Sequence, residues 1–310
     1  MRALIVTNMY PSPEHPALGS FVADQVAALR RSGQVEVEVF AFAPGGYRAY
    51  TGAARGLRAG GRERHERFDV VHAHFGLTSW PARIVPATVH AVTLHGTDLA
   101  HPRSRPVTLA GLALNDLVGV VSPALAGELP RWARRRRVRV LPCGVDLHRF
   151  QPIDRTWART ELGLDPDGRY LLFPSDPRRA EKRHDLARLA AGDTPLLTLG
   201  NVAPDRVPLW VNAANAVLIP SDREGFGLAV LEALACDVPV LATPVGIAPE
   251  VLAGVPGDLC APFDRHAWQR TLKPHLNQRD PRVPGRARAQ PYSSDAMATR
   301  VLDAWRALLD

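Results

Sequence analysis

Short apolar runs rich in valine, isoleucine and leucine alternate along the chain with segments in which apolar residues recur at helical spacing. Continuous apolar runs of this length are typical of parallel strands that are covered by helices on both faces. The pattern therefore predicts an α/β fold. The expected strands are residues 4–7, 35–41, 70–73, 91–94, 117–121 and 138–141 in the first half, and 170–173, 196–199, 216–219, 238–242 and 258–261 in the second.

Other segments differ in how clearly they predict structure. A helix is expected from Ser20, the candidate N-cap, because the next apolar residues share one face. Residues 44–67 are rich in glycine and arginine without apolar periodicity, which predicts a mobile basic loop. The last segment, 294–310, is predicted to be a helix that packs against a larger body, because one stripe carries Met297, Val301, Leu302, Trp305 and Leu309.

A turn-rich connector after residue 141 is the best candidate for a boundary between domains. The 310 residues exceed the usual size of one domain. We therefore expect an N-terminal domain at residues 1–150, a C-terminal domain at 151–290 and a terminal helix at 291–310.

The basic excess lies entirely in the first half, which carries 19 Lys and Arg against 11 Asp and Glu. Such a surface suits a phosphate-bearing substrate or an anionic membrane, although an arginine-rich composition alone also explains it. The run of arginines with one tryptophan at residues 131–139 allows membrane contact, or it is simply a solvated helix end. No nucleic-acid recognition motif is present, so we expect no nucleic-acid partner.

Three cysteines without close spacing favour a reducing compartment. The chain opens on a strand-like run without a signal segment, and no apolar run approaches the ~18 residues that cross a bilayer. We therefore expect a cytoplasmic protein, with contact at the inner face of the membrane being peripheral at most.

The segment from residue 219 to residue 235 passes from an apolar strand through a Gly-Phe-Gly turn into a helix. Gly225 and Gly227 let backbone N–H groups approach a ligand, and the helix dipole favours an anion there. Glu224 and Glu232 are placed to accept hydrogen bonds from hydroxyl groups. The alternative is a helix with an acidic first turn and one solvated glutamate.

A basic turn follows the strand at residues 170–173. Lys182 would supply a point charge and Arg178 or Arg179 a forked donor to a diphosphate, although a solvated turn remains possible. In the first half, Gly19 lies where a backbone amide could face a phosphate, or where the chain merely turns.

His74 and His95 end consecutive strands, at the edge where open α/β sheets bind ligands. A structural role is the alternative for each of them. We assign His72 and His74 to opposite faces of their strand and therefore expect no metal pair there.

The stretch from Glu224 to Glu232, together with the later Ala-Cys-Asp-Val-Pro-Val, resembles the E-G-F-G-x-x-x-x-E motif and the following segment of the family-4 glycosyltransferases. These are retaining GT-B enzymes, whose two Rossmann-like domains face each other across a cleft. The resemblance implies that the first glutamate and the next three residues hold the transferred sugar and that Glu232 holds the ribose. It also implies that His95 contacts the donor and that the C-terminal helix returns to the first domain. The sugar-holding set is Glu224, Gly225, Phe226 and Gly227.

The resemblance has departures. Ser175-Asp176 occupies the place of the family's Gly-Arg, so Arg179, with Arg178 in reserve, is assigned to the diphosphate. This variant looks like the branch of teichuronic acid biosynthesis transferases. Only 17 residues separate Lys182 from Gly200, where relatives fit an additional strand and helix.

The sequence thus predicts a hexosyltransferase that uses a nucleoside diphosphate sugar, with UDP as the expected nucleotide. The acceptor would be a saccharide or a lipid-linked hydroxyl, in the biosynthesis of a cell-surface polysaccharide or glycoconjugate. His95, Glu224 and Lys182 are the expected catalytic residues. No cofactor or metal is expected, because no D-x-D motif suits a metal-bridged diphosphate. Alternatives are another GT-B enzyme, such as an epimerase or phosphorylase, and a nucleotide-sugar binding protein without activity.

Overall fold

The computed structural model describes residues 1–63, 67–134, 138–200 and 202–310. The chain forms two compact units. Unit 1 comprises Met1–Gly144 together with Ser294–Asp310, and unit 2 comprises Val145–Ser293. The sequence predicts this boundary at residue 150, at the end of the same connector.

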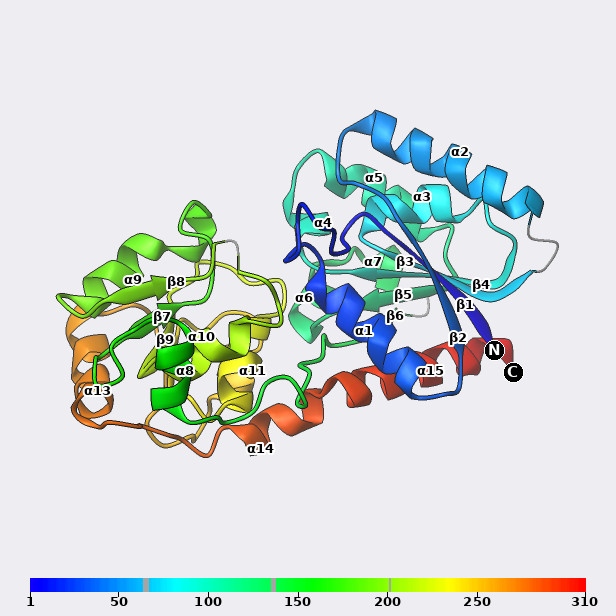
Figure 1. The fold of residues 1–310 in the computed structure, drawn as a ribbon. Helices are drawn as coiled ribbons and strands as arrows, with labels where there is room; N and C mark the ends of the chain where they lie inside the picture. The colour runs from blue at the N-terminus through cyan, green and yellow to red at the C-terminus, as the bar shows by residue number, and fades with distance from the viewer. Residues whose placement is uncertain (64–66, 135–137, 201) are drawn as a thin grey trace. The chain divides into compact units, whose positions relative to one another are not determined.

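Unit 1 is built on a parallel sheet of six strands within its described residues, in the order β2-β1-β3-β4-β5-β6. Helices α1 and α15 lie on one face of this sheet, and α2, α3 and α5 lie on the other (Figure 1). The strands are β1 Arg2–Thr7, β2 Glu36–Ala41, β3 Phe68–His74, β4 Ala87–Leu94, β5 Leu117–Val120 and β6 Val138–Val140. The helices are α1 Ser20–Arg31, α2 Tyr47–Glu63, η1 Gly76–Thr78, α3 Ser79–Ala82, α4 Thr97–Ala100, α5 Ser104–Leu112, α6 Pro123–Glu128, α7 Arg131–Arg134 and α15 Ser294–Leu309.

Unit 2 holds a second parallel sheet, in the order β11-β10-β9-β7-β8. Helices α9 and α13 share a core with one face of it. The strands are β7 Leu171–Phe173, β8 Leu196–Thr198, β9 Ala216–Ile219, β10 Val240–Ala242 and β11 Leu259–Cys260. The helices are α8 Arg155–Glu161, η2 Ala180–Lys182, α9 His184–Ala191, α10 Val207–Ala213, α11 Leu228–Ala235, α12 Ala248–Val251, α13 Arg265–Asn277, α14 Arg286–Ala289 and η3 Gln290–Tyr292.

Each predicted strand coincides with an observed one to within a few residues. The reason is physical: a strand buried on both faces needs an unbroken apolar run, and such runs are short and conspicuous in the sequence. The α/β prediction is therefore confirmed.

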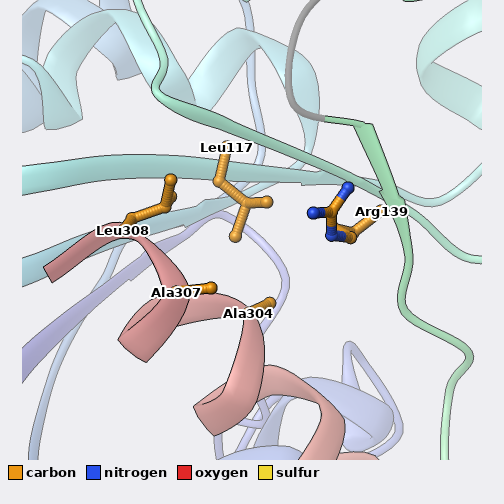
Figure 2. A pocket seen from close by; sticks show the side chains of 5 residues that line it. All are labelled: Leu117, Arg139, Ala304, Ala307 and Leu308. Atoms are coloured by element: carbon orange, nitrogen blue, oxygen red, sulfur yellow. The ribbon is translucent and has the colours of Figure 1, made fainter. Parts of the chain in front are cut away.

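The terminal helix α15 is part of unit 1, where it packs on α1 and on the sheet (Figure 1). Its predicted stripe is buried along most of its length, and Trp305 is completely buried. Arg31 at the end of α1 forms an ion pair of 2.7 Å with Asp295 at the start of α15. Helix α15 leaves a small crevice of about 110 Å³ against β5 and β6. Figure 2 shows the side chains that line it. Its lining residues are Leu117, Arg139, Ala304, Ala307 and Leu308.

The predicted mobile loop at residues 44–67 is wrong over most of its length, because Tyr47–Glu63 forms helix α2. Alanine and arginine are good helix formers, and a narrow stripe of small apolar residues suffices to bury one face. Ala53 and Leu57 are buried, and Gly56 lies against the ring of Phe40. Because glycines and arginines surround this narrow apolar stripe, the segment shows no apolar periodicity in the sequence.

A buried carboxyl in unit 2 makes stability depend on pH. Burial raises the pKa of Asp258 from 3.8 to about 7, against the opposing effect of the hydrogen bond donated by the Val240 N–H. Its second oxygen, Oδ2, is buried and has no hydrogen-bond partner among the described residues. Between these pKa values the folded state holds a proton that the unfolded state lacks, so stability falls as pH rises.

We expect Asp258→Asn to stabilise the protein increasingly as pH rises from about 5 to about 7. The gain should reach at most about 1.4 kcal/mol per pH unit, since one pKa unit corresponds to that free energy. Urea unfolding of both proteins at several pH values measures it. A difference between the two proteins that does not change with pH would contradict the assignment.

Candidate functional site

In unit 2 the loop between β9 and α11 is fixed by two glycines. Gly227 has φ +99° and is the N-cap of α11, a backbone conformation that side-chain-bearing residues rarely adopt. Gly246 has φ +60°, and a Cβ there would lie 2.4 Å from the carbonyl oxygen of Phe226. The amide of Ile247 donates a hydrogen bond of 2.7 Å to that oxygen. The loop is thus held tightly against the next turn of the chain.

Glu224 and Lys182 meet at this edge of the sheet, although they are 42 positions apart in the sequence. Lys182 Nζ lies 2.6 Å from Glu224 Oε2, and the two side chains are 14% and 10% exposed. The other carboxylate oxygen, Oε1, accepts a hydrogen bond of 2.7 Å from Ser221 Oγ. A cation and a carboxylate that remain partly accessible can recognise an anionic group and a hydroxyl group side by side.

Ser221 is a residue whose role the sequence analysis missed. It is buried, and the hydroxyl of Thr243 donates to its carbonyl oxygen. The spacing of three residues between Ser221 and Glu224 could have signalled the contact, since the loop turns back on itself there.

Arg178 and Arg179 lie on an exposed turn, and each pairs with a neighbouring carboxylate. Arg178 contacts Asp176 at 2.7 Å, and Arg179 contacts Glu181 at 2.7 Å. The hydrogen bonds from Arg178 lower the pKa of Asp176 to about 2. In this arrangement the carboxylate of Asp176 neutralises the charge of Arg178. The assignment of a diphosphate to either arginine stays a prediction.

The basic turn and the Glu224 loop are joined by further contacts that the sequence did not predict. The Asp222 amide donates to the Glu181 carbonyl oxygen at 3.0 Å. Arg183, whose φ is +56°, bridges the carboxylates of Asp185 and Asp222 at 2.8 and 3.0 Å. These contacts position Lys182 beside Glu224.

The remaining unit 2 candidates lie at or on helix α11. Gly225 is partly buried, and the ring of Phe226 is buried with its centroid 6.2 Å from that of Tyr292. Glu232 is partly buried within α11. The assignment of Glu232 to a ribose stays a prediction.

In unit 1, Gly19 is the N-cap of α1, and the expected N-cap Ser20 is instead the first helical residue. Gly19 has φ +65°, and a Cβ there would lie 2.2 Å from the carbonyl carbon and oxygen of Met9. Close approach of two backbone segments therefore requires glycine here. A ring contact of 4.7 Å between Phe21 and His95 brings the start of α1 next to the end of β4.

Our assignment of His72 and His74 to opposite faces is wrong. Residues two apart on a strand share a face, and the rings stack with centroids 4.9 Å apart and planes at 10°. His74 also stacks on His95 at 5.3 Å, and their Nδ1 and Nε2 atoms lie 3.0 Å apart. Among the described residues, no group of three or more His, Cys, Asp or Glu side chains is arranged to hold a metal ion.

Asp98 is a second residue that the sequence analysis missed. It is completely buried and accepts hydrogen bonds of 2.6 Å from the backbone amides of Gly76 and His95. It therefore ties together the carboxyl ends of β3 and β4, where His74 and His95 lie. The His-Gly-Thr-Asp run after β4 was the available signal, because a carboxylate near a strand end often caps free amides.

Residues 135–137 of the arginine run at residues 131–139 lie outside the described residues. Trp132 on α7 is 48% exposed, between the exposed Arg131 and Arg134. No helix in the described ranges is long and apolar enough to cross a membrane. Contact with an anionic membrane stays a prediction.

Comparison with known proteins matches both halves of the chain to glycosyltransferases. The family model described as Glycosyltransferase Family 4 matches residues 18–149, and the one described as Glycosyl transferases group 1 matches residues 169–278. A D-inositol 3-phosphate glycosyltransferase from Actinosynnema mirum is 29% identical, over 88% of each chain. One of the same name from Pseudarthrobacter chlorophenolicus is 28% identical, over 60% of this chain but 56% of its own length.

Solved structures resemble the whole chain. A sucrose-phosphate synthase from Thermosynechococcus elongatus has a TM-score of 0.75 at 20% identity, covering 99% of both chains. Anabaena HepE in complex with UDP and glucose has a TM-score of 0.70 at 16% identity, covering 98% of this chain and 99% of its own. These likenesses confirm the predicted GT-B fold of two Rossmann-like domains.

Proposed function

We propose that this chain, which has the GT-B fold and two domains similar to those of family-4 glycosyltransferases, is a retaining glycosyltransferase. It would move a hexose from a nucleoside diphosphate sugar to an acceptor hydroxyl. The family matches support transfer of a glycosyl group in general. Retention, the hexose and the acceptor are our inference.

The observation that carries the proposal is the pair of Lys182 and Glu224 beside the N-terminus of α11, with Nζ and Oε2 2.6 Å apart. A diphosphate leaving group needs positive charge, and a sugar needs acceptors for its hydroxyl groups. This edge of unit 2 offers both within the reach of one ligand.

Departure of the diphosphate builds negative charge, which Lys182 and the N-terminal amides of α11 would stabilise. The sugar becomes oxocarbenium-like at the same time. Retention would follow from attack on the face that the diphosphate leaves, with a phosphate oxygen accepting the proton of the acceptor hydroxyl. Glu224 would orient the sugar, so no side chain needs to act as a nucleophile.

We propose UDP as the nucleotide, which the complex of HepE with UDP and glucose supports. The first half of the chain has an excess of positive charge, with 19 cationic and 11 anionic side chains, which favours an acceptor that bears phosphate. The name D-inositol 3-phosphate glycosyltransferase that relatives carry is consistent with such an acceptor. A role in cell-surface polysaccharide synthesis, in the teichuronic acid branch, remains the alternative.

Thermal-shift measurements with UDP, GDP and ADP, followed by transfer assays with the matching sugars, test this proposal. We expect UDP to raise Tm more than GDP or ADP does, because binding to the folded state stabilises it by mass action. A product with the donor's anomeric configuration, formed only when an acceptor is present, would support retaining transfer. Turnover of donor alone to a new sugar would indicate an epimerase, and binding without turnover across many acceptors would indicate a binding protein.

A further inference from the structure

A column of three stacked histidines, two of them buried, lies at the ends of β3 and β4 in unit 1. The rings of His72, His74 and His95 stack in order, with centroid distances of 4.9 and 5.3 Å. His72 and His74 are completely buried, and His95 is partly exposed. The column therefore runs from the core to the carboxyl edge of the sheet, and His95 is its outermost member.

The proton positions on His72 follow from its partners. Trp305 on α15 donates its indole N–H to His72 Nδ1 at 3.1 Å, so this nitrogen carries no hydrogen in the neutral ring. The hydrogen must then be on Nε2, which lies 2.7 Å from Thr93 Oγ1 and donates to it. Both nitrogens of His72 are thus engaged in hydrogen bonds, and neither is available for a hydrogen bond with His74.

The three rings are neutral near pH 7. Burial lowers the pKa of His74 to about 3, and burial together with neighbouring rings lowers the pKa values of His72 and His95 well below 6.5. Each neutral ring has one N–H. Because His74 Nδ1 and His95 Nε2 lie 3.0 Å apart, within hydrogen-bond distance, one of the two rings donates its N–H to the other.

His74 decides which ring donates. Its Nε2 is buried and has no hydrogen-bond partner among the described residues. If His95 were the donor, His74 would carry its own N–H on this atom, and a buried N–H without an acceptor is the arrangement that folded proteins avoid most strongly. If His74 donates from Nδ1, the unpartnered atom is only a lone pair. His95, being partly exposed, tolerates either form.

We propose that His74 is a positioning residue, which donates its Nδ1–H to His95 Nε2 and thereby fixes His95 as the Nδ1–H tautomer. His95 then presents a neutral N–H donor, rather than a lone pair, on the ring edge that His74 does not contact. Phe21 packs against the same ring at 4.7 Å and limits its rotation. This inference rests on the proposed function and on the contact between His95 and the donor that the family resemblance implies.

Nuclear magnetic resonance of the protein labelled with ¹⁵N-histidine tests the tautomer without any substrate. We expect His95 to show a protonated Nδ1 and an unprotonated Nε2, with signals assigned by their loss in His95→Asn. In His74→Leu the hydrogen bond donated to His95 Nε2 is absent, and we expect His95 Nε2 to become protonated. In His74→Asn the side-chain amide can donate from nearly the position of Nδ1, so the wild-type pattern should return.

His90→Leu is the matched control, because His90 is a buried histidine on the same strand β4 that bonds to the Val85 carbonyl oxygen instead. It should leave the His95 signals unchanged. A wild-type His95 that is protonated on Nε2, or a His95 pattern that His74→Leu does not alter, would overturn the proposal. The wild-type spectrum decides the first point even if a variant fails to fold.

Kinetics then connect the tautomer to catalysis. We expect His74→Leu to lower kcat by roughly 10- to 100-fold with a smaller change in KM, since a misplaced contact costs about this much, and His74→Asn to restore most of it. An equal kcat for His74→Leu and wild type would overturn the positioning role. Because the spectra need no donor, a correct tautomer in an enzyme without transferase activity would contradict the proposed function alone.

Discussion

Glu224→Gln is expected to lower the rate of sugar transfer by about 10²-fold or more, while the protein still folds. The glutamine keeps the size of the side chain but loses its charge and turns one acceptor into a donor. Glu224 is held by Ser221 at 2.7 Å and Lys182 at 2.6 Å, so its carboxylate is aimed before a sugar arrives. Loss of a preorganised contact to the reacting sugar has an effect of this size.

Steady-state transfer assays measure the effect, with Glu161→Gln as the matched control. Glu161 is an exposed glutamate at the end of α8 in the same unit, and its variant should retain wild-type kcat. Turnover of Glu224→Gln within about twofold of wild type would remove Glu224 from the proposed site.

Lys182→Met is expected to lower kcat by roughly 10²- to 10³-fold and to weaken UDP binding. Methionine keeps most of the apolar stem and removes the charge that would stabilise the departing diphosphate, and removal of one such electrostatic contact typically costs this much. Lys273→Met provides the control, because Lys273 is the other lysine of the chain and lies exposed on α13. An unchanged UDP affinity in Lys182→Met would contradict the phosphate role.

The double variant separates catalysis from stability. Each single change leaves a partly buried partner without its counter-charge, and hydrogen bonds to charged groups contribute about 1.5–3 kcal/mol. We expect Lys182→Met combined with Glu224→Gln to unfold at a higher temperature than the sum of the single effects predicts. Transfer should nevertheless stay at or below the rate of the slower single variant. Recovery of activity in the double variant would reduce the pair to a structural ion pair.

The sequence was most informative where a single local requirement, such as a backbone conformation or the burial of a strand, determines which residue types fit. Gly227 and Gly246 adopt positive φ, and the strand before α11 needs an unbroken apolar run. Such requirements leave a local trace, so the loop containing Glu224 could be identified before its partners were known. Helix α2 was missed because Ala53 and Leu57 bury a face too narrow to show as apolar periodicity.

Several side-chain pairings were missed, between near neighbours in the sequence as well as between distant residues. The sequence analysis treated Arg178 and Arg179 as cations free to bind a diphosphate. In the folded chain each forms an ion pair with a carboxylate two residues away, Asp176 and Glu181 respectively. The stacking of His72 on His74 follows from the strand period, and our assignment missed it by misapplying that period. Trp305, 233 residues from His72, was predicted to be buried, but its indole bond to that histidine was not.

The sequence by itself determined the positions of the strands along the chain, the division into two α/β units and the loop at Glu224, because burial periodicity and backbone sterics act over a few residues. Only the tertiary structure decided which charged and polar groups meet. The Lys182–Glu224 pair and the His72–His74–His95 column form at strand ends that the parallel sheets bring together. The charges, bond partners and tautomers of these groups depend on distances and burial that no local pattern encodes.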